Sequence, residues 1–237
     1  MSDILIYSDG SSKGNPGPGG WGAIVAAHDT VRELGGRAEH TTNNKMELLA
    51  AFEALKSIPH DPTISVVIRT DSKYVMSGAT MWRWGWLKSD WKTKEGKDVI
   101  NQDLWKPFSS LLHTWGKQVQ WEKVGGHVSI PANERVDDIA QSFAAGEPIK
   151  LYSGSRKEYS VDVTSVEVDT ERQEKKKEVS GRSKIAAYSY ISEVDGTVLT
   201  HKTWAECEAR VRGKRARFKK AISKDEEEQI IKEFSKR

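Results

Sequence analysis

Short apolar runs and segments with a helical repeat of apolar positions follow one another along the first 148 residues. Runs rich in β-branched and aromatic residues predict five strands, at residues 4–8, 21–27, 31–34, 64–70 and 119–124. Apolar residues at helical spacing predict four helices, at residues 46–55, 72–77, 101–115 and 134–145. Asn43 or Asn44 is expected to cap the first of these helices. Three strands followed by alternating helices and strands indicate an α/β fold with a five-stranded mixed sheet flanked by helices.

The pattern changes beyond this region. Large apolar residues nearly vanish from Ser153 to Ser183, and residues 171–178 are almost all charged, which is typical of a solvated linker. Apolar periodicity resumes at Ile185 with a strand pair around Asp195-Gly196 and two helices, which predicts a second, small α/β domain. Residues 212–220, between the two helices, are interpreted as a basic segment. The expected division is 1–148 for the first domain, 149–183 for a charged flexible linker and 184–237 for the second domain.

The overall composition adds little to this organisation, but the distribution of charged residues along the chain is informative. The net charge is only +3, but the segment from Lys184 onward holds 13 Lys and Arg against 9 Asp and Glu, so the positive excess lies in the second domain. The single Cys207 excludes an internal disulfide framework and a Cys-based zinc site. No apolar run is long enough to span a membrane and no secretory leader is recognisable, so we expect a monomeric cytoplasmic protein with no membrane partner.

Four acids have similar positions relative to the predicted elements. Asp9 and Asp71 end strands, whereas Glu47 and Asp137 lie in helices that follow loops. Taken singly, each is more typical of a helix cap, a first-turn acid or a solvated helix residue. If they converge, they repel one another unless divalent cations neutralise them, and Mg²⁺ prefers such oxygen ligands. Two ions could activate a water and stabilise the leaving oxygen of a phosphodiester. We call these four residues the carboxylate cluster.

The residues around these acids resemble the type 1 ribonucleases H in order and spacing over roughly residues 3 to 147. Five segments carry the resemblance: Asp9-Gly10-Ser11 with Gly14-Asn15-Pro16-Gly17, Thr41-Thr42-Asn43-Asn44-Lys45-Met46-Glu47, Thr70-Asp71-Ser72, Gly126-His127, and Asn133-Glu134-Arg135 before Asp137. Any one of them alone is a weak signal, but their joint occurrence is a strong one.

This resemblance implies endonucleolytic cleavage of the RNA strand of an RNA/DNA hybrid, leaving 5′-phosphate and 3′-hydroxyl ends. It implies two Mg²⁺ ions per site, with Mn²⁺ as the alternative. Asp9 would bridge both ions, Glu47 and Asp71 would complete the shell of one, and Asp137 would serve the other. His127 matches a flexible histidine that assists proton transfer or product release.

The resemblance also implies residues that contact the substrate. Asn15, Asn43 and Asn44 would read the 2′-hydroxyls of the RNA strand, and Thr42 would anchor a phosphate of the DNA strand. Tryptophans of a protrusion would face the DNA strand; they are Trp82, Trp86 and Trp91. The usual cations of this protrusion are replaced by Leu87-Lys88-Ser89-Asp90, which predicts fewer phosphate contacts. Trp84 and Trp105 are expected to pack against the body of the domain.

The second domain resembles the small hybrid-binding, or viroplasmin-like, domain over roughly residues 184 to 235. The segments Thr203-Trp204-Ala205-Glu206-Cys207 and Ala216-Arg217-Phe218-Lys219-Lys220 carry this resemblance. It implies stacking on DNA sugars or contacts to phosphates at five positions, namely Tyr188, Trp204, Phe218, Lys219 and Lys220. Arg217 would add a minor-groove contact. The alternative for Trp204 and Phe218 is a role in the core of this small domain.

Two other functions fit parts of the pattern. One is a non-catalytic protein that binds RNA/DNA hybrids with a decayed nuclease fold, and the presence of all four acids argues against it. The other is a nuclease of the same fold that acts on DNA, and the asparagines that match 2′-hydroxyl readers argue against that.

Overall fold

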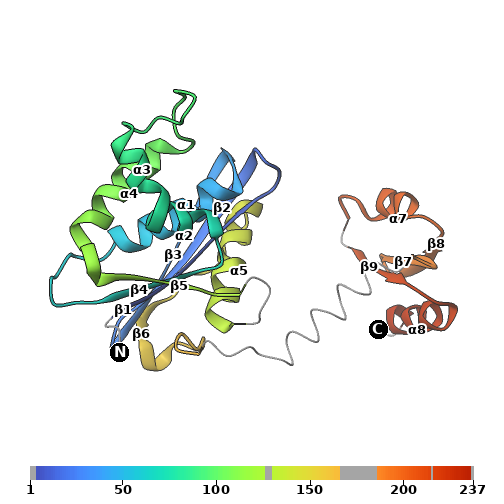
Figure 1. Ribbon diagram of the computed structural model, residues 1–237. Coiled ribbons are helices and arrows are strands. Elements are labelled where there is room, and N and C mark those ends of the chain that lie inside the picture. The colour runs from blue at the N-terminus through green and yellow to red at the C-terminus, as the bar shows by residue number, and fades with distance from the viewer. Residues whose placement is uncertain (1–3, 126–129, 166–185, 215, 236–237) are drawn as a thin grey trace. The chain divides into compact units, whose positions relative to one another are not determined.

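The computed structural model describes residues 4–125, 130–165, 186–214 and 216–235 (Figure 1). The chain divides into two compact units, Met1–Thr170 and Glu171–Arg237. We describe each unit by itself. Among the described residues, no helix combines the length and the apolar character that a membrane crossing requires.

The first unit is built on a mixed sheet in the order β5-β4-β1-β2-β3-β6. Its strands are β1 (Ile4–Ser12), β2 (Gly17–Ala26), β3 (Thr30–Thr41), β4 (Val66–Thr70), β5 (Val119–Lys123) and β6 (Ser153–Ser155). The sequence β6-β3-β2-β1 is antiparallel, whereas β1, β4 and β5 run parallel. The predicted mixed α/β sheet is therefore confirmed.

The predicted number of five strands is wrong, because β6 adds a sixth. This strand consists of Ser-Gly-Ser, which has no apolar alternation that could reveal it. It forms because its backbone pairs with the edge of β3, from Thr30 opposite Ser155 to Arg32 opposite Ser153. The strand lies inside the expected linker. Residues 149–165 of that linker belong to the first unit in the structure.

Helices cover both faces of this sheet (Figure 1). They are α1 (Asn43–Lys56), α2 (Lys73–Ser77), η1 (Gly78–Trp82), α3 (Arg83–Lys88), α4 (Gln102–Trp115) and α5 (Pro131–Ala145), with short 3-10 turns η2 (Gly116–Gln118) and η3 (Arg156–Glu158). One core contains Leu48 and Leu55 of α1 and Phe108 of α4. The opposite core contains Val136 of α5 together with Val163. The sheet is thus enclosed between α1 and α4 on one face and α5 with the 149–165 segment on the other.

Two helix starts differ from the prediction. The cap of α1 is Thr42, whose side chain accepts a hydrogen bond from the backbone N–H of Lys45, and not Asn43 or Asn44. Helix α5 begins at Pro131, where the fixed φ of proline suits the first helical position. Asp137 therefore lies in the second turn of its helix and not in the first.

The second unit is a three-stranded antiparallel sheet in the order β8-β7-β9. Its elements are β7 (Ser189–Val194), β8 (Thr197–His201), α7 (Trp204–Val211), β9 (Ala216–Ala221) and α8 (Lys224–Ser235). Val194, Cys207 and Val211 form a core under α7, and Ile191, Ile230 and Phe234 form another under α8. The predicted small α/β arrangement is confirmed, and the basic segment of 212–220 contains the strand β9.

Candidate active site

The end of β1 approaches the start of α1 closely enough that only glycine fits at position 10. A Cβ on Gly10 would lie 2.2 Å from the backbone nitrogen of Glu47 and 2.5 Å from the carbonyl carbon of Met46. No side chain can yield to relieve these contacts, because both involve backbone atoms. The close approach places Asp9 beside the helix turn that carries Glu47.

We expect Gly10→Ala to lower the free energy of unfolding by about 3 kcal/mol, because β1 and α1 must separate to admit the methyl group. Urea denaturation measures this loss. Gly85→Ala is a suitable control, because nothing lies within 4 Å of a Cβ built on Gly85. Equal stability of the two variants would contradict the packing of β1 against α1.

Asp71 reaches the same place through the parallel pairing of β1 with β4. Tyr7 lies opposite Arg69 in this pairing. Asp9 follows Tyr7 by two positions, and Asp71 follows Arg69 by two positions. The carboxyl ends of neighbouring parallel strands meet at one edge of the sheet. Asp9 and Asp71 therefore share that edge.

Asp137 is delivered from the other face by the close packing of α5 on β2. Asp9 lies opposite Gly22 in the antiparallel pairing of β1 with β2. A Cβ on Gly22 would lie 2.5 Å from the carbonyl oxygen of Val136, the residue before Asp137. The absence of a side chain at Gly22 thus allows α5 to bring Asp137 toward Asp9.

The charges of these acids act on one another. The pKa of Asp9 is raised from 3.8 to about 8, mainly by burial and then by the carboxylates of Asp71, Asp137 and Glu47. Only the N–H of Gly10, which donates to Asp9 Oδ1 over 2.7 Å, acts in the opposite direction. The structure therefore brings all four members of the carboxylate cluster into electrostatic contact.

Glu47 is held by two donors from different elements. Asn43 Nδ2 donates to Glu47 Oε1 over 2.8 Å, and Ser72 Oγ donates to Glu47 Oε2. Burial, followed by the charge of Asp71, raises the pKa of Glu47, and these two hydrogen bonds oppose the rise. Sequence reasoning gave Ser72 no role of its own, although its place directly after Asp71 was a usable signal. Asn43 contacts Glu47 and so has a second task besides the expected contact with RNA.

The residues of the cluster suit a hard divalent cation. Across the described parts of the chain, no three His, Cys, Asp or Glu side chains form a group that could hold a metal by themselves. The cluster is therefore open. Mg²⁺ tolerates this, because it usually takes one or two carboxylates and completes its shell with waters and substrate phosphates. An all-oxygen set around the half-buried Asp9, whose pKa is raised by burial and by three neighbouring carboxylates, fits such an ion.

The expected substrate residues of the first unit are partly exposed around this site. Asn15 lies exposed between β1 and β2, and Asn44 is exposed in the first turn of α1. Thr42 is half-buried and caps α1. His127 lies outside the described residues.

The tryptophans of the protrusion do not form one exposed surface. Trp82 is 43% exposed, Trp86 is half-buried, and Trp91 is 6% exposed. Their rings follow one another at centroid distances of 5.9 Å, from Trp82 to Trp86 and from Trp86 to Trp91. Trp91 packs against Trp86 and exposes little of its own surface, and its contact with the substrate stays a prediction.

The two tryptophans that were expected to pack behave differently. Trp105 is completely buried, as predicted. The prediction for Trp84 is wrong, because 48% of this residue is exposed and the guanidinium of Arg83 lies 4.1 Å from its ring centroid. An irregular, π-helical turn at η1 precedes α3, so simple helical spacing does not give the face of each tryptophan.

The second unit has an exposed aromatic surface. Tyr188, Trp204 and Phe218 are 53%, 40% and 50% exposed, so the core alternative for Trp204 and Phe218 does not hold. The rings of Trp204 and Phe218 lie 5.4 Å apart, and Tyr190 lies 5.7 Å from Trp204 on the other side. We call Tyr188, Tyr190, Trp204 and Phe218 the aromatic platform. Tyr190 was missed by sequence reasoning, although alternation along β7 places it on the face of Tyr188.

Two of the expected cationic contacts lie on the opposite face of the second sheet. Arg217 Nε donates to Glu193 Oε2 over 2.9 Å and Arg217 Nη2 donates to the carbonyl oxygen of Phe234. Lys219 Nζ pairs with Glu233 over 2.7 Å. Alternation along β9 puts Phe218 and Lys220 on the face toward α7 and these two cations on the face toward α8. In the structure Arg217 contacts Glu193 of β7 and Phe234 of α8, and Lys219 contacts Glu233 of α8, so their contact with substrate stays a prediction that concerns another face than that of Phe218.

Comparisons with known proteins agree with this arrangement. A family model described as RNase H matches residues 1–145. The chain is 49% identical over 150 residues to a ribonuclease H of a Cyanothece species, covering 62% of this chain and 92% of the relative. It is 46% identical over 162 residues to a ribonuclease H of a Ruegeria species, covering 66% of this chain and 99% of the relative.

A solved structure extends the likeness to three dimensions. It is LC9-RNase H1, described as a type 1 RNase H with the type 2 active-site motif. The two share 29% identity and a TM-score of 0.56 over 69% of this chain and 83% of the other. The likeness is therefore one of fold as well as of sequence.

Proposed function

The chain belongs to the ribonuclease H family, and from this premise we propose that it hydrolyses the RNA strand of RNA/DNA hybrids at the carboxylate cluster, leaving 5′-phosphate and 3′-hydroxyl ends. The observation that carries the proposal is the convergence of four acids, which the close packing at Gly10 and Gly22 and the parallel pairing of β1 with β4 bring together. The pKa of Asp9, raised to about 8 by burial and by three neighbouring carboxylates, agrees with this convergence. Acids held this close repel one another unless cations bind between them. The cluster is therefore suited to chemistry with divalent cations.

The four acids divide between two cation positions in this proposal. Asp9 would contribute to both, Glu47 and Asp71 would contribute to one, and Asp137 would contribute to the other. Mg²⁺, or Mn²⁺ in its place, would activate the attacking water and stabilise the leaving oxygen when bound with the substrate. Ser72 and Asn43 fix the direction of the Glu47 carboxylate, so this ligand does not need to reorganise when the cation arrives. His127 is proposed to carry a proton or to assist product release.

Selection of the RNA strand requires a group that contacts the 2′-hydroxyl across the wide minor groove. Asn15 and Asn44 are exposed and carry both donors and acceptors, which suits this contact. Thr42 uses its oxygen as an acceptor for the N–H of Lys45, so its hydroxyl proton can be donated to a phosphate of the DNA strand. Trp82 and Trp86 of the protrusion would support the same strand.

The second unit is proposed to bind the same kind of hybrid. The aromatic platform offers ring faces for stacking, and Lys220 lies on the same face as Phe218. Binding of both units to one hybrid raises the effective concentration of the active site on that hybrid. Residues 184–237 would thus increase affinity while the first unit performs the cleavage.

Strand-specific cleavage assays test this function against its alternatives. The full chain is incubated with Mg²⁺ and one of three duplexes, each labelled on either strand: RNA/DNA hybrid, duplex DNA or duplex RNA. We expect cleavage of the RNA strand of the hybrid alone, and complete loss of cleavage when a chelator removes the cation.

Each contrary result identifies a different alternative. Hybrid binding without cleavage would indicate a non-catalytic binding protein. Cleavage of duplex DNA would indicate a DNA-directed nuclease of the same fold. End-group analysis of the products then checks the predicted 5′-phosphate and 3′-hydroxyl.

A further inference from the structure

The 149–165 segment lies beyond the region that the family model matches and packs on the first unit (Figure 1). Its strand β6 extends the sheet along β3, and Val163 is buried in the core that α5 covers. The rings of Tyr152 and Tyr159 lie 4.9 Å apart beside that core. The segment is therefore part of the structure that holds the site.

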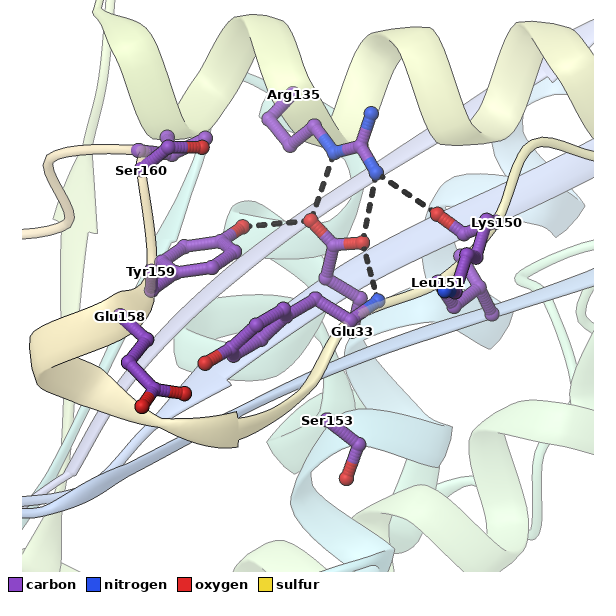
Figure 2. A pocket seen from close by; sticks show the side chains of 10 residues that line it. Glu33, Arg135, Lys150, Leu151, Ser153, Glu158, Tyr159 and Ser160 are labelled. Atoms are coloured by element: carbon purple, nitrogen blue, oxygen red, sulfur yellow. Dashed lines mark hydrogen bonds and ion pairs between the residues drawn. The ribbon is translucent and has the colours of Figure 1, made fainter.

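One buried carboxylate joins this segment to the helix of Asp137. Glu33 of β3 has a completely buried side chain, which accepts hydrogen bonds from Nε and Nη2 of Arg135 over 2.7 and 2.8 Å (Figure 2). The hydroxyl of Tyr159 donates to it over 2.6 Å, and the backbone N–H of Tyr152 donates over 2.9 Å. Arg135 also donates to the carbonyl oxygen of Lys150. Arg135 lies two residues before Asp137, so the network fixes α5 at that point.

A second contact joins the segment to the strands of Asp9 and Asp71. The hydroxyl of Tyr7 donates to the carbonyl oxygen of Val163 over 3.1 Å and accepts a hydrogen bond from Arg69 over 2.7 Å. Tyr7 lies two residues before Asp9, and Arg69 lies two residues before Asp71. The same segment therefore contacts α5 and β1 directly and reaches β4 through the hydroxyl of Tyr7.

We propose that the 149–165 segment positions the carboxylate cluster for cation binding, with Tyr159 and Tyr7 as positioning residues. This inference rests on the proposed function, because it assumes that the cluster binds divalent cations. Repulsion among the four acids favours movement of α5 away from β1 when no cation is bound. The bidentate pair of Arg135 with Glu33, tied to the segment by Tyr159, opposes that movement.

The space beside Glu33 allows the positioning role of Tyr159 to be tested in a variant that still folds. A cavity of about 610 Å³ adjoins Glu33, Arg135 and Tyr159 (Figure 2). Water from this cavity can replace the hydroxyl of Tyr159 in Tyr159→Phe, so the variant keeps its buried carboxylate hydrogen-bonded. A water molecule is not attached to the segment, however, and so does not hold α5 in place.

The test compares three full-chain variants with the wild type. Tyr159→Phe and Tyr7→Phe each remove a hydroxyl that joins the segment to the site. Tyr152→Phe is the matched control, because its hydroxyl donates to Ser155 within the segment itself. The Mg²⁺ dissociation constant of the free protein is measured by titration calorimetry, beside the Mg²⁺ concentration that gives half-maximal cleavage and the midpoint of thermal unfolding.

We expect Tyr159→Phe and Tyr7→Phe to weaken Mg²⁺ binding about fivefold and Tyr152→Phe to leave it unchanged. Cleavage at saturating Mg²⁺ should stay near the wild-type rate in all three. Equal dissociation constants in all folded variants, or no Mg²⁺ binding by the wild type, would overturn the inference. Mg²⁺ binding by the wild type without hybrid cleavage would instead overturn the proposed function, and the dissociation constants would still decide the positioning role.

Discussion

Asp9→Asn is expected to lower the rate of RNA-strand cleavage by roughly 10³-fold or more while making the protein more stable. The loss of activity follows from the proposed position of Asp9 between both cations. The gain in stability follows from its pKa of about 8, because burial, and then the three other carboxylates, make ionisation of Asp9 costly. An asparagine removes this charge and keeps an oxygen to accept the N–H of Gly10. Cleavage assays and urea denaturation at pH 7 measure the two effects.

The pH dependence of this stability gain has a definite sign. A carboxyl whose pKa is raised in the folded state binds protons more strongly there than in the unfolded chain, so it lowers stability as pH rises from about 4 to about 8. The advantage of Asp9→Asn should therefore be about 4 kcal/mol near pH 7 and should vanish near pH 3.5. A constant difference at all pH values would show that Asp9 is not subject to this repulsion.

Mg²⁺ should reverse the order of stability. Cations that bind only the folded state stabilise it by mass action, and the wild type has the more complete ligand set. Thermal unfolding in increasing Mg²⁺ should raise the midpoint of the wild type more than that of Asp9→Asn. Glu53→Gln is a suitable control, because Glu53 lies on α1 and pairs only with the neighbouring Lys56 among the contacts described.

The carboxylate cluster could be predicted from the sequence because five segments around its members occur together in order and spacing, whereas each acid taken singly is a weak signal. Asp9 and Asp71 follow apolar strands directly, and Gly10 and Gly22 permit the close approaches that bring Glu47 and Asp137 to them. The first five strands and four of the covering helices follow from apolar periodicity, whereas the order of the strands in the sheet is seen only in the structure. The sixth strand did not, because Ser153–Ser155 has no pattern and exists only through its pairing with β3.

Long-range polar contacts were the part that the sequence could not reveal. Glu33 meets Arg135 and Tyr159 across more than a hundred residues, and nothing local marks them as partners. The faces of Arg217 and Lys219 were missed for a different reason, because alternation along a strand could have separated them from Phe218. Residues 212–220 were interpreted as a basic segment, and the strand period was not applied to them.

The two faces of β9 should contribute differently to hybrid binding, and neighbouring residues of this strand allow the comparison. We expect Trp204→Ala combined with Phe218→Ala to weaken binding of the full chain to RNA/DNA hybrid by about 100-fold at moderate salt. Each lost stacking contact costs about 1–3 kcal/mol, and both side chains are exposed, so the fold of the second unit should persist. Fluorescence anisotropy with a labelled hybrid measures the affinity, and circular dichroism checks the fold.

The matched controls are Arg217→Ala and Lys219→Ala, which remove positive charge from the face that α8 covers. Arg217 contacts Glu193 and the ring and carbonyl oxygen of Phe234, so its loss should reduce the stability of the second unit by about 1 kcal/mol. Hybrid affinity should fall less than about threefold in either variant, because only distant charge is lost. If instead Arg217→Ala weakened hybrid binding as much as the aromatic double variant, substrate would have to contact the α8 face, and the aromatic platform would not be the binding surface. Phe218 lies between Arg217 and Lys219 in β9. A difference in hybrid affinity between these variants therefore distinguishes the two faces of one strand, because all three residues lie in the same region of the protein.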